Sequence, residues 1–322
     1  MAIFEMTMLF LGSIIGAGFA TGAEIITFFG KWQLSPWLIA SIIGIAIFLM
    51  ITLEIVLFYP TKTSPAPIKP NKKLYIGIVM IYLILFTAMT AGITQITNPI
   101  ICLISLIFSA IIALLGTQKL THFNRLIVPI IIVLIITTAL PHTSSMPTPP
   151  QSNQHLIPTL FWAMLYAGLN CFMFPEFIIA NATHVKRRDL FWAGLLTAGL
   201  VTVLAGLILS TIQATQTTTE PIPLLSAAPT PITVLVILLA ILTSQYTTLF
   251  AITERLGQII PSTKNKPLMT VACVCLIALI GSLCGFTHII QYGYPLIGAL
   301  TCFYLLFSFL QRFWQVSHGH QL

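Results

Sequence analysis

Charged side chains are scarce in this sequence. Only 7% of its 322 residues are Asp, Glu, Lys or Arg, and only 7 residues are acidic. By contrast, 57% of the residues are hydrophobic, and the mean hydropathy is +0.99. A water-soluble domain of this length covers its surface with far more charge. The composition therefore excludes a soluble globular protein and predicts an integral membrane protein with several spans.

Motifs for catalysis and nucleotide binding are also missing. The sequence has no Walker motif, zinc signature, haem-type histidine pair or nucleophile motif. We therefore expect no enzyme, no cofactor beyond a coupling ion and no nucleic-acid partner. All six cysteines lie in apolar runs, which predicts buried free thiols and no disulfide framework: Cys102, Cys171, Cys273, Cys275, Cys284 and Cys302.

Long apolar runs predict an all-α protein with ten transmembrane helices. A proline lies near the start of five of these runs, where its missing N–H does no harm. The predicted spans are 4–30, 35–58, 74–96, 98–116, 125–141, 158–182, 189–213, 231–256, 267–285 and 289–313. They divide one membrane domain into two groups of five, at residues 1–156 and 157–322.

Basic residues predict the orientation of these spans. The termini and the loops after even-numbered spans hold 13 of the 14 Lys and Arg residues, and the other loops hold only Lys31. Positively charged loops stay on the cytoplasmic side. We therefore expect both termini in the cytoplasm.

The first span contains an unusual stretch from Gly12 to Gly30. Glycines recur at 12, 16, 18 and 22, and Glu24 follows. Each glycine weakens a helix interior by roughly 1 kcal/mol, and an acid at bilayer depth costs about 2.5–3.5 kcal/mol on insertion scales. Non-helical backbone at this depth occurs only beside protein or a water-filled cavity. The stretch predicts half-helices at 4–15 and 22–30, joined by an unwound Gly16–Thr21.

A second stretch of this kind lies in the sixth span. Residues 166–176 carry Asn170, the helix breaker Pro175 and then the acid Glu176, with the interruption expected at Leu169–Pro175. The first and sixth spans start on opposite sides of the membrane. Paired interrupted helices in two halves of a chain are typical of a five-plus-five inverted repeat with its binding site at the midplane.

These residues also carry a resemblance to a known family. The segment from Ile15 to Glu24 (IGAGFATGAE), followed by FFG at 28–30, resembles the first helix of YkvI-like bacterial membrane proteins. The pair Tyr166 and Asn170 is similar to that family as well, as is YTT at 246–248. The resemblance implies the LeuT-type fold of the amino acid–polyamine–organocation superfamily, alternating access, and a bacterial cytoplasmic membrane. Unlike the expected family pattern, Ala23 stands where a Gln precedes the acid.

The two interruptions together suggest a binding site for a small molecule. Free backbone N–H groups at the first break can donate to an anionic group, and carboxylates can meet an amine. The alternative for each acid is stabilisation of a half-helix N-terminus, and for Asn170 an ordinary interhelical hydrogen bond. The predicted substrate-binding residues are Gly16, Ala17, Gly18, Phe19, Glu24, Tyr166, Asn170 and Glu176.

A cation site is suggested by the eighth span, where Ser244, Thr247, Thr248 and Ala251 share one helix face. The fold resemblance implies a sodium site formed by Thr247 and Thr248 with the carbonyls of Gly12 and Ile15. Ordinary small-residue helix packing is the alternative. A proton remains a second possible coupling ion, carried by Glu24. The remaining acids of this kind, Glu54 and Glu254, are expected to be ion-paired or solvated near the cytoplasmic ends of their spans.

The function favoured by these features is secondary active transport of a small amino acid or an amine-bearing organic ion, coupled to Na⁺ or H⁺. An ion channel would also explain interrupted helices, but the sequence has no filter-like repeat or charged ring. A membrane-embedded enzyme or quinone-binding subunit would need a catalytic cluster or His ligands inside the spans, and the sequence shows neither.

The predicted topology has a direct test. Cysteines introduced one at a time into loop 142–157 should react with an impermeant thiol reagent only from outside the cell. Cysteines in loop 60–73 should react only in inverted vesicles, because that loop carries four lysines. The opposite labelling pattern would overturn the predicted orientation.

Overall fold

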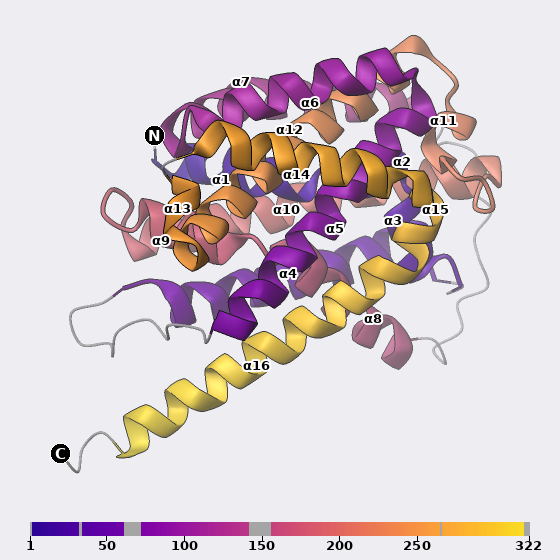
Figure 1. Cartoon of the computed structure of the whole chain (residues 1–322). Helices are drawn as coiled ribbons and strands as arrows, with labels where there is room; N and C mark the ends of the chain where they lie inside the picture. The colour runs from indigo at the N-terminus through magenta and orange to yellow at the C-terminus, as the bar shows by residue number, and fades with distance from the viewer. Residues whose placement is uncertain (1, 32–33, 61–71, 142–155, 265, 319–322) are drawn as a thin grey trace.

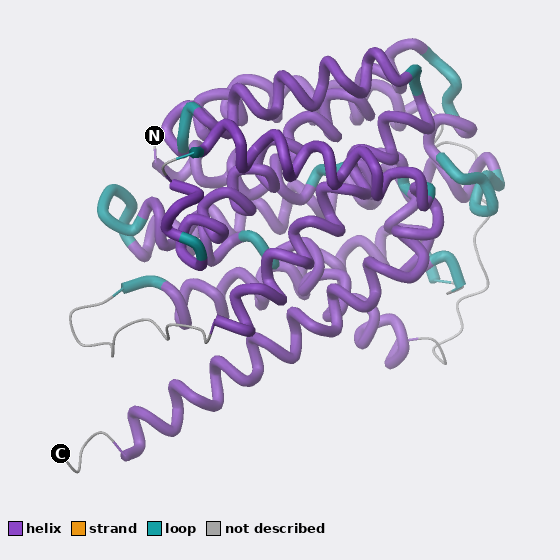
Figure 2. Tube along the Cα trace, in the orientation of Figure 1, coloured by secondary structure: helices purple, strands orange, loops and turns teal. Residues whose placement is uncertain are grey.

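A computed structural model of the chain describes residues 2–31, 34–60, 72–141, 156–264 and 266–318. Its regular structure is helical, with no strand in these ranges (Figures 1 and 2). The two loops that carry the topology prediction lie largely outside these described ranges.

The first half of the chain forms seven α-helices within the described residues: α1 (Ala2–Ile14), α2 (Ala17–Thr21), α3 (Ala23–Phe29), α4 (Pro36–Phe58), α5 (Lys72–Ile96), α6 (Pro99–Leu114) and α7 (Thr117–Ala139). The second half contains the long helices α8 (Leu156–Cys171), α10 (Arg187–Thr215), α12 (Pro231–Ile259), α14 (Pro267–Gly281) and α16 (Tyr294–His318). Shorter elements lie between them: α9 (Phe174–Asn181), α11 (Pro223–Ala227), α13 (Pro261–Lys264), a 3-10 turn at Ser282–Cys284, α15 (Phe286–His288) and a π-helical turn at Ile289–Gly293.

Polar caps and prolines begin several of the long helices. Ser35 accepts from the Leu38 N–H ahead of α4, and Asn98 and Thr230 cap α6 and α12 in the same way. A proline occupies the first position of each of these helices, where no intrahelical N–H bond is lost. The helix starts predicted from these prolines are confirmed.

Among the residues that the structure describes, seven helices are long and apolar enough to cross a bilayer, or eight if the bent pair α8 and α9 is one span. The apolar helices α1 and α6 are shorter, at 13 and 16 residues. Large apolar side chains such as Ile104, Phe303 and Phe307 are exposed on α6 and α16. Outward-facing residues of this kind are suited to lipid contact, and the chain is a multi-pass membrane protein.

The predicted interruption of the first span is present, but its geometry differs from the prediction. Residues 17–21 form a helical turn, α2, instead of an unwound segment. The breaks lie on either side of it, at the extended Gly16 and at Gly22, whose φ is +77°. Residues other than glycine rarely adopt that backbone angle. The glycines therefore divide the span into three helical pieces.

The sixth span is interrupted within the predicted segment. α8 continues through Cys171, and α9 begins at Phe174 with Pro175 in its first turn. The two helices are bent by 47° at this break. The proline locates the restart, since it cannot continue the N–H ladder of α8.

Two local expectations were wrong. α7 begins at Thr117, eight residues before the predicted start, so Lys119 and Arg125 lie on a helix. Among the cysteines, only Cys102 and Cys171 are buried, and Cys273 and Cys284 are exposed. In α7, the mixed polar and apolar residues of the first turns resemble a loop in sequence. For the cysteines, an apolar run that faces outward resembles a buried run.

The helices pack around α12, which contacts α1, α2, α5, α6 and α7. A second layer is formed by α4, which packs along α8, α9 and α10. α16 contacts α8 and α4, and its C-terminal end projects beyond the bundle (Figure 1). α1 and α2 thus pack on α12, α8 and α9 pack on α4, and the residues at both breaks are buried.

Candidate functional site

The two interrupted spans meet at Glu24 and Asn170. Glu24 lies in the first turn of α3, and Asn170 lies one residue before the end of α8. The Asn170 amide donates to Glu24 Oε1 at 2.8 Å and to the Tyr166 carbonyl at 3.0 Å. Both side chains are buried, with exposed fractions of 4% and 7%. The contact joins residues 146 positions apart in the sequence.

Gly18 leaves the space that the Glu24 carboxyl group occupies. A Cβ at Gly18 would lie 2.5 Å from Glu24 Oε2 and 3.0 Å from the Tyr294 ring. Any larger residue would therefore displace the carboxyl group. Of the predicted backbone donors, Gly16 donates its N–H to the Ile14 carbonyl. The other three predicted donors, the N–H groups of Ala17, Gly18 and Phe19, lie in the first turn of α2. The side chains of Ala17 and Phe19 are buried.

Tyr166 contributes an aromatic wall to this site. Its ring makes edge contacts with Phe28 and Phe29, with centroids 5.3 and 5.5 Å apart. Its hydroxyl group is buried next to the Glu24 carboxyl group and Asn170, although it makes no hydrogen bond of normal geometry within the described residues. This hydroxyl is therefore a second polar group directly beside the carboxyl group.

The predicted cation ligands are only partly brought together. The Ser244 hydroxyl lies 3.2 Å from the Gly12 carbonyl oxygen and 3.1 Å from that of Ile15. The hydroxyl of Thr247 instead donates to Thr243 and Ser244 carbonyls on its own helix. The Ser244 hydroxyl oxygen and the carbonyl oxygens of Gly12 and Ile15 thus converge. Thr247 and Thr248 lie one helix turn further along α12.

Thr248 faces two methionines. Its hydroxyl lies 3.4 Å from the Met173 sulfur and 3.8 Å from that of Met89. Met173 lies in the break between α8 and α9, and Met89 belongs to α5. The second break therefore meets α12 through thioether and hydroxyl groups.

Glu176 is held by an ion pair and makes no contact with Glu24. Arg255 of α12 donates to Glu176 Oε1 through Nε and forms a salt bridge through Nη2. Tyr82 of α5 donates to the same oxygen at 3.3 Å. The Arg255 guanidinium also lies 5.1 Å from the Tyr75 ring centre. This buried cluster links α5, α9 and α12.

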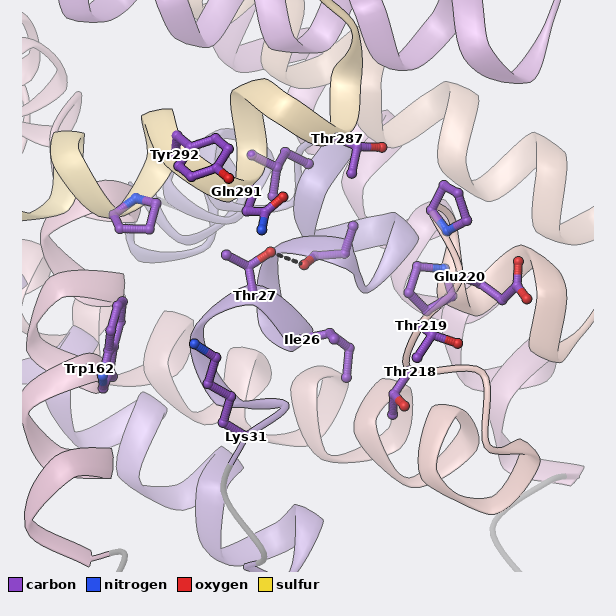
Figure 3. Close-up of a pocket in the computed structure, with 15 residues that line it drawn as sticks. Ile26, Thr27, Lys31, Trp162, Thr218, Thr219, Glu220, Thr287, Gln291 and Tyr292 are labelled. Carbon is purple, nitrogen blue, oxygen red and sulfur yellow. Dashed lines mark hydrogen bonds between the residues drawn. The ribbon is translucent and has the colours of Figure 1, made fainter.

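A polar cavity of about 460 Å³ lies beside α3. Figure 3 shows Lys31 and Trp162 on one side of it and Glu220, Thr218 and Thr219 on the other. Gln291 and Tyr292 of the π-helical turn lie above Thr27, whose hydroxyl donates to the Ala23 carbonyl at 2.9 Å. Ala23 and Thr27 both line the cavity, so it adjoins the helix turn that carries Glu24. It opens on the side predicted to be extracellular.

Sequence reasoning missed three features of the interior. Arg255 was counted only among the basic residues that set the orientation, yet it is 7% exposed and pairs with Glu176 inside the protein. Tyr82 and Asn124 were not singled out, although Asn124 accepts a hydrogen bond from the buried Tyr246 hydroxyl. A polar residue within an apolar helix was the available signal. The expectation that Glu54 is ion-paired or solvated was also wrong, since it is fully buried with no hydrogen-bond partner among the described residues.

The Glu176–Arg255 pair generates a stability prediction. Arg255→Met leaves the Glu176 carboxylate buried and unpaired, and should lower the free energy of unfolding by about 3–5 kcal/mol. Adding Glu176→Gln should restore most of that loss, because the remaining charge is removed. Thermal unfolding in detergent measures both. Arg125→Met is the matched control: it removes a half-buried ion pair with Glu5 (2.9 Å) and should cost less than about 1 kcal/mol. A double variant no more stable than Arg255→Met would contradict the assignment.

Comparison with known proteins supports the fold. No protein-family model and no curated protein sequence matches the chain. Among solved structures, a histidine-to-alanine mutant of the Eremococcus coleocola manganese transporter matches with a TM-score of 0.61 and 12% identity, over 95% of this chain and 77% of that one. The same transporter in complex with an aromatic bis-isothiourea substituted compound matches with a TM-score of 0.55 and 12% identity, over 95% and 78%. At this identity the likeness establishes the fold alone: this chain has the fold of a membrane transporter.

Proposed function

We propose that the chain is a secondary active transporter that works by alternating access. Ten transmembrane helices in a five-plus-five inverted repeat would place α1–α3 and α8–α9 in equivalent positions of the two halves. Both spans are interrupted near a glutamate, which supports that correspondence. The membrane would be the bacterial cytoplasmic membrane, with both termini inside, as the distribution of Lys and Arg favours.

The observation that carries this proposal is the hydrogen bond between Asn170 and Glu24. It joins the two interrupted spans at a buried point, between the first turn of α3 and the last turn of α8, so each partner lies next to the break in its own span. A carboxyl group held at such a junction has few structural uses, because desolvation makes it expensive. A binding site shared by two moving halves of a transporter accounts for its position.

A small amino acid or amine-bearing organic ion is the substrate class that we propose. Glu176 is already neutralised by Arg255, which leaves the Glu24 carboxyl group and the Tyr166 hydroxyl to meet a cationic amine. The polar cavity beside α3 carries both Lys31 and Glu220 and would admit a zwitterion. An ion channel is disfavoured because the interior next to Glu24 is packed with buried aromatic rings.

A metal ion is the second candidate substrate, because the structural neighbour is a manganese transporter. Against it, no group of three or more His, Cys, Asp or Glu side chains gathers within the described residues. The thioethers of Met89 and Met173 are soft ligands, whereas Mn²⁺ prefers oxygen. An amine therefore fits these residues better than Mn²⁺ does.

Sodium is the coupling ion that we propose, with a proton as the alternative. Alkali cations require hard oxygen ligands, and the Gly12 and Ile15 carbonyls meet the Ser244 hydroxyl at about the spacing of such a ligand set. Thr247 and Thr248 would join them after a small rotation of α12. A lysine in the fifth span could take the place of such a cation, but the predicted span 125–141 has none, and Lys119 lies in the first turn of α7.

The role of Glu24 has a functional test. Glu24→Gln should abolish uptake of labelled amino acids or amines into proteoliposomes, because the amide cannot neutralise a cationic amine or carry a proton. Folding should be preserved, since a glutamine oxygen can still accept the Asn170 hydrogen bond. Glu254→Gln, a change on the exposed part of α12, is the control and should transport normally. Normal transport by Glu24→Gln would reduce Glu24 to a structural group, and Mn²⁺ uptake in place of amine uptake would favour the second candidate.

The sodium site is tested by thermal-shift titration of substrate with and without Na⁺. In the wild-type protein, Na⁺ should increase the substrate-induced shift. Ser244→Ala should remove that increase by deleting one of three converging oxygens. The double variant Thr247→Ala/Thr248→Ala should also remove the Na⁺-dependent increase if α12 rotates on cation binding and brings these hydroxyls to the site. Uptake driven equally well by a proton gradient in sodium-free buffer would contradict sodium coupling.

A further inference from the structure

Glu54 is a buried acid for which the proposed transport site has no use. It lies in α4, about one helix turn before the helix ends at Phe58. Its exposed fraction is 0%, and neither carboxyl oxygen has a hydrogen-bond partner within the described residues. An isolated buried carboxylate is so unfavourable that such a group neutralises itself by keeping its proton.

The surroundings of Glu54 also favour the neutral acid. α4 packs along α8, and Cys171, the last residue of α8, lies near enough to interact electrostatically with Glu54. The C-terminal end of a helix carries a partial negative charge and carbonyl oxygens that lack intrahelical donors. A carboxylate is repelled by such an end, whereas a neutral, protonated carboxyl group is not.

No cation among the described residues compensates Glu54. The four helices packed against α4 are α8, α9, α10 and α16. Glu176 of α9 is paired with Arg255, and Arg312 of α16 donates to the Leu57 carbonyl. The charged residues of α10 lie in its first turn, at the surface. Up to Arg312 of α16, these helices contribute the following titratable groups: Tyr166, Cys171, Glu176, Arg187, Arg188, Asp189, Tyr294, Cys302, Tyr304 and Arg312.

We propose that Glu54 is a proton-binding site of the transport cycle, protonated while α4 is packed on α8 and deprotonated when that interface opens. On opening, the carboxyl O–H bond breaks, the proton passes to an entering water molecule, and the carboxylate becomes hydrated. Closing reverses the step. The 47° bend between α8 and α9 begins directly after Cys171, so movement at the second break reaches Glu54. The inference rests on the proposed alternating access, because that motion opens the interface.

The protonation itself is tested without transport. Infrared spectroscopy of the full chain in lipid at neutral pH should show the C=O stretching band of a protonated carboxylic acid. Glu54→Gln should remove this component, and the control Glu254→Gln should leave it, since Glu254 is exposed. Glu54→Met, a neutral and apolar replacement, should remove it as well, which covers the case where the glutamine variant does not fold. An unchanged band in a folded Glu54 variant would overturn the proposal.

The link to opening is tested through Cys171, a buried native thiol beside Glu54. Its alkylation by a membrane-permeant thiol reagent, quantified by mass spectrometry relative to Cys273 on the outward face of α14, reports the opening of the interface. In the wild-type protein this ratio should rise with pH, by up to about tenfold per pH unit if one proton is released on opening. In Glu54→Gln the ratio should not change with pH. A pH dependence that is the same in both proteins would overturn the link. A chain with the infrared band and the Cys171 response but no solute transport would overturn the proposed function and leave the proton site intact.

Discussion

The hydrogen bond from Asn170 to Glu24 is the contact on which the arrangement of the interior depends. It ties the first turn of α3 to the last turn of α8, and each partner is almost completely removed from solvent. Gly18 is small because the carboxyl group lies against its backbone, and Gly22 is a glycine because the chain has a positive φ there. The sequence of the first span is thus explained by the need to bring one acid to one amide.

Three buried glutamates illustrate three ways to accommodate an acid within a membrane protein. Glu176 has an arginine, Glu24 has a neutral amide donor, and Glu54 has neither. Because desolvation opposes the charged form in each case, the partner decides how readily the group can change its charge. The Glu176–Arg255 ion pair holds α9 and α12 together in this conformation. Glu24 and Glu54 remain able to bind a cation or a proton. This difference separates the structural acid from those that we propose to function in transport.

The sequence was informative where backbone chemistry is local. Glycines and an acid in the first span, and a proline and an acid in the sixth, were enough to predict both interruptions, and prolines marked several helix starts. It was less informative where helix rotation decides contacts: Ser244 meets the first break, although Thr247 and Thr248 lie on the same face. Glu176 and Arg255 lie 79 residues apart in the sequence, and no local pattern encodes their pairing. The burial of Glu54 was missed for the same reason, since a single acid near a helix end looks solvated in sequence.

Alternating access around the Glu24–Asn170 junction is the central claim, and counterflow tests it most directly. Proteoliposomes loaded with an unlabelled amino acid or amine would be diluted into a trace of the labelled compound. The account predicts transient accumulation of label above its equilibrium level in the wild-type protein, and none in Glu24→Gln, because exchange requires a binding site that faces each side in turn. Simple equilibration of label without overshoot, at equal rates in both proteins, would contradict it.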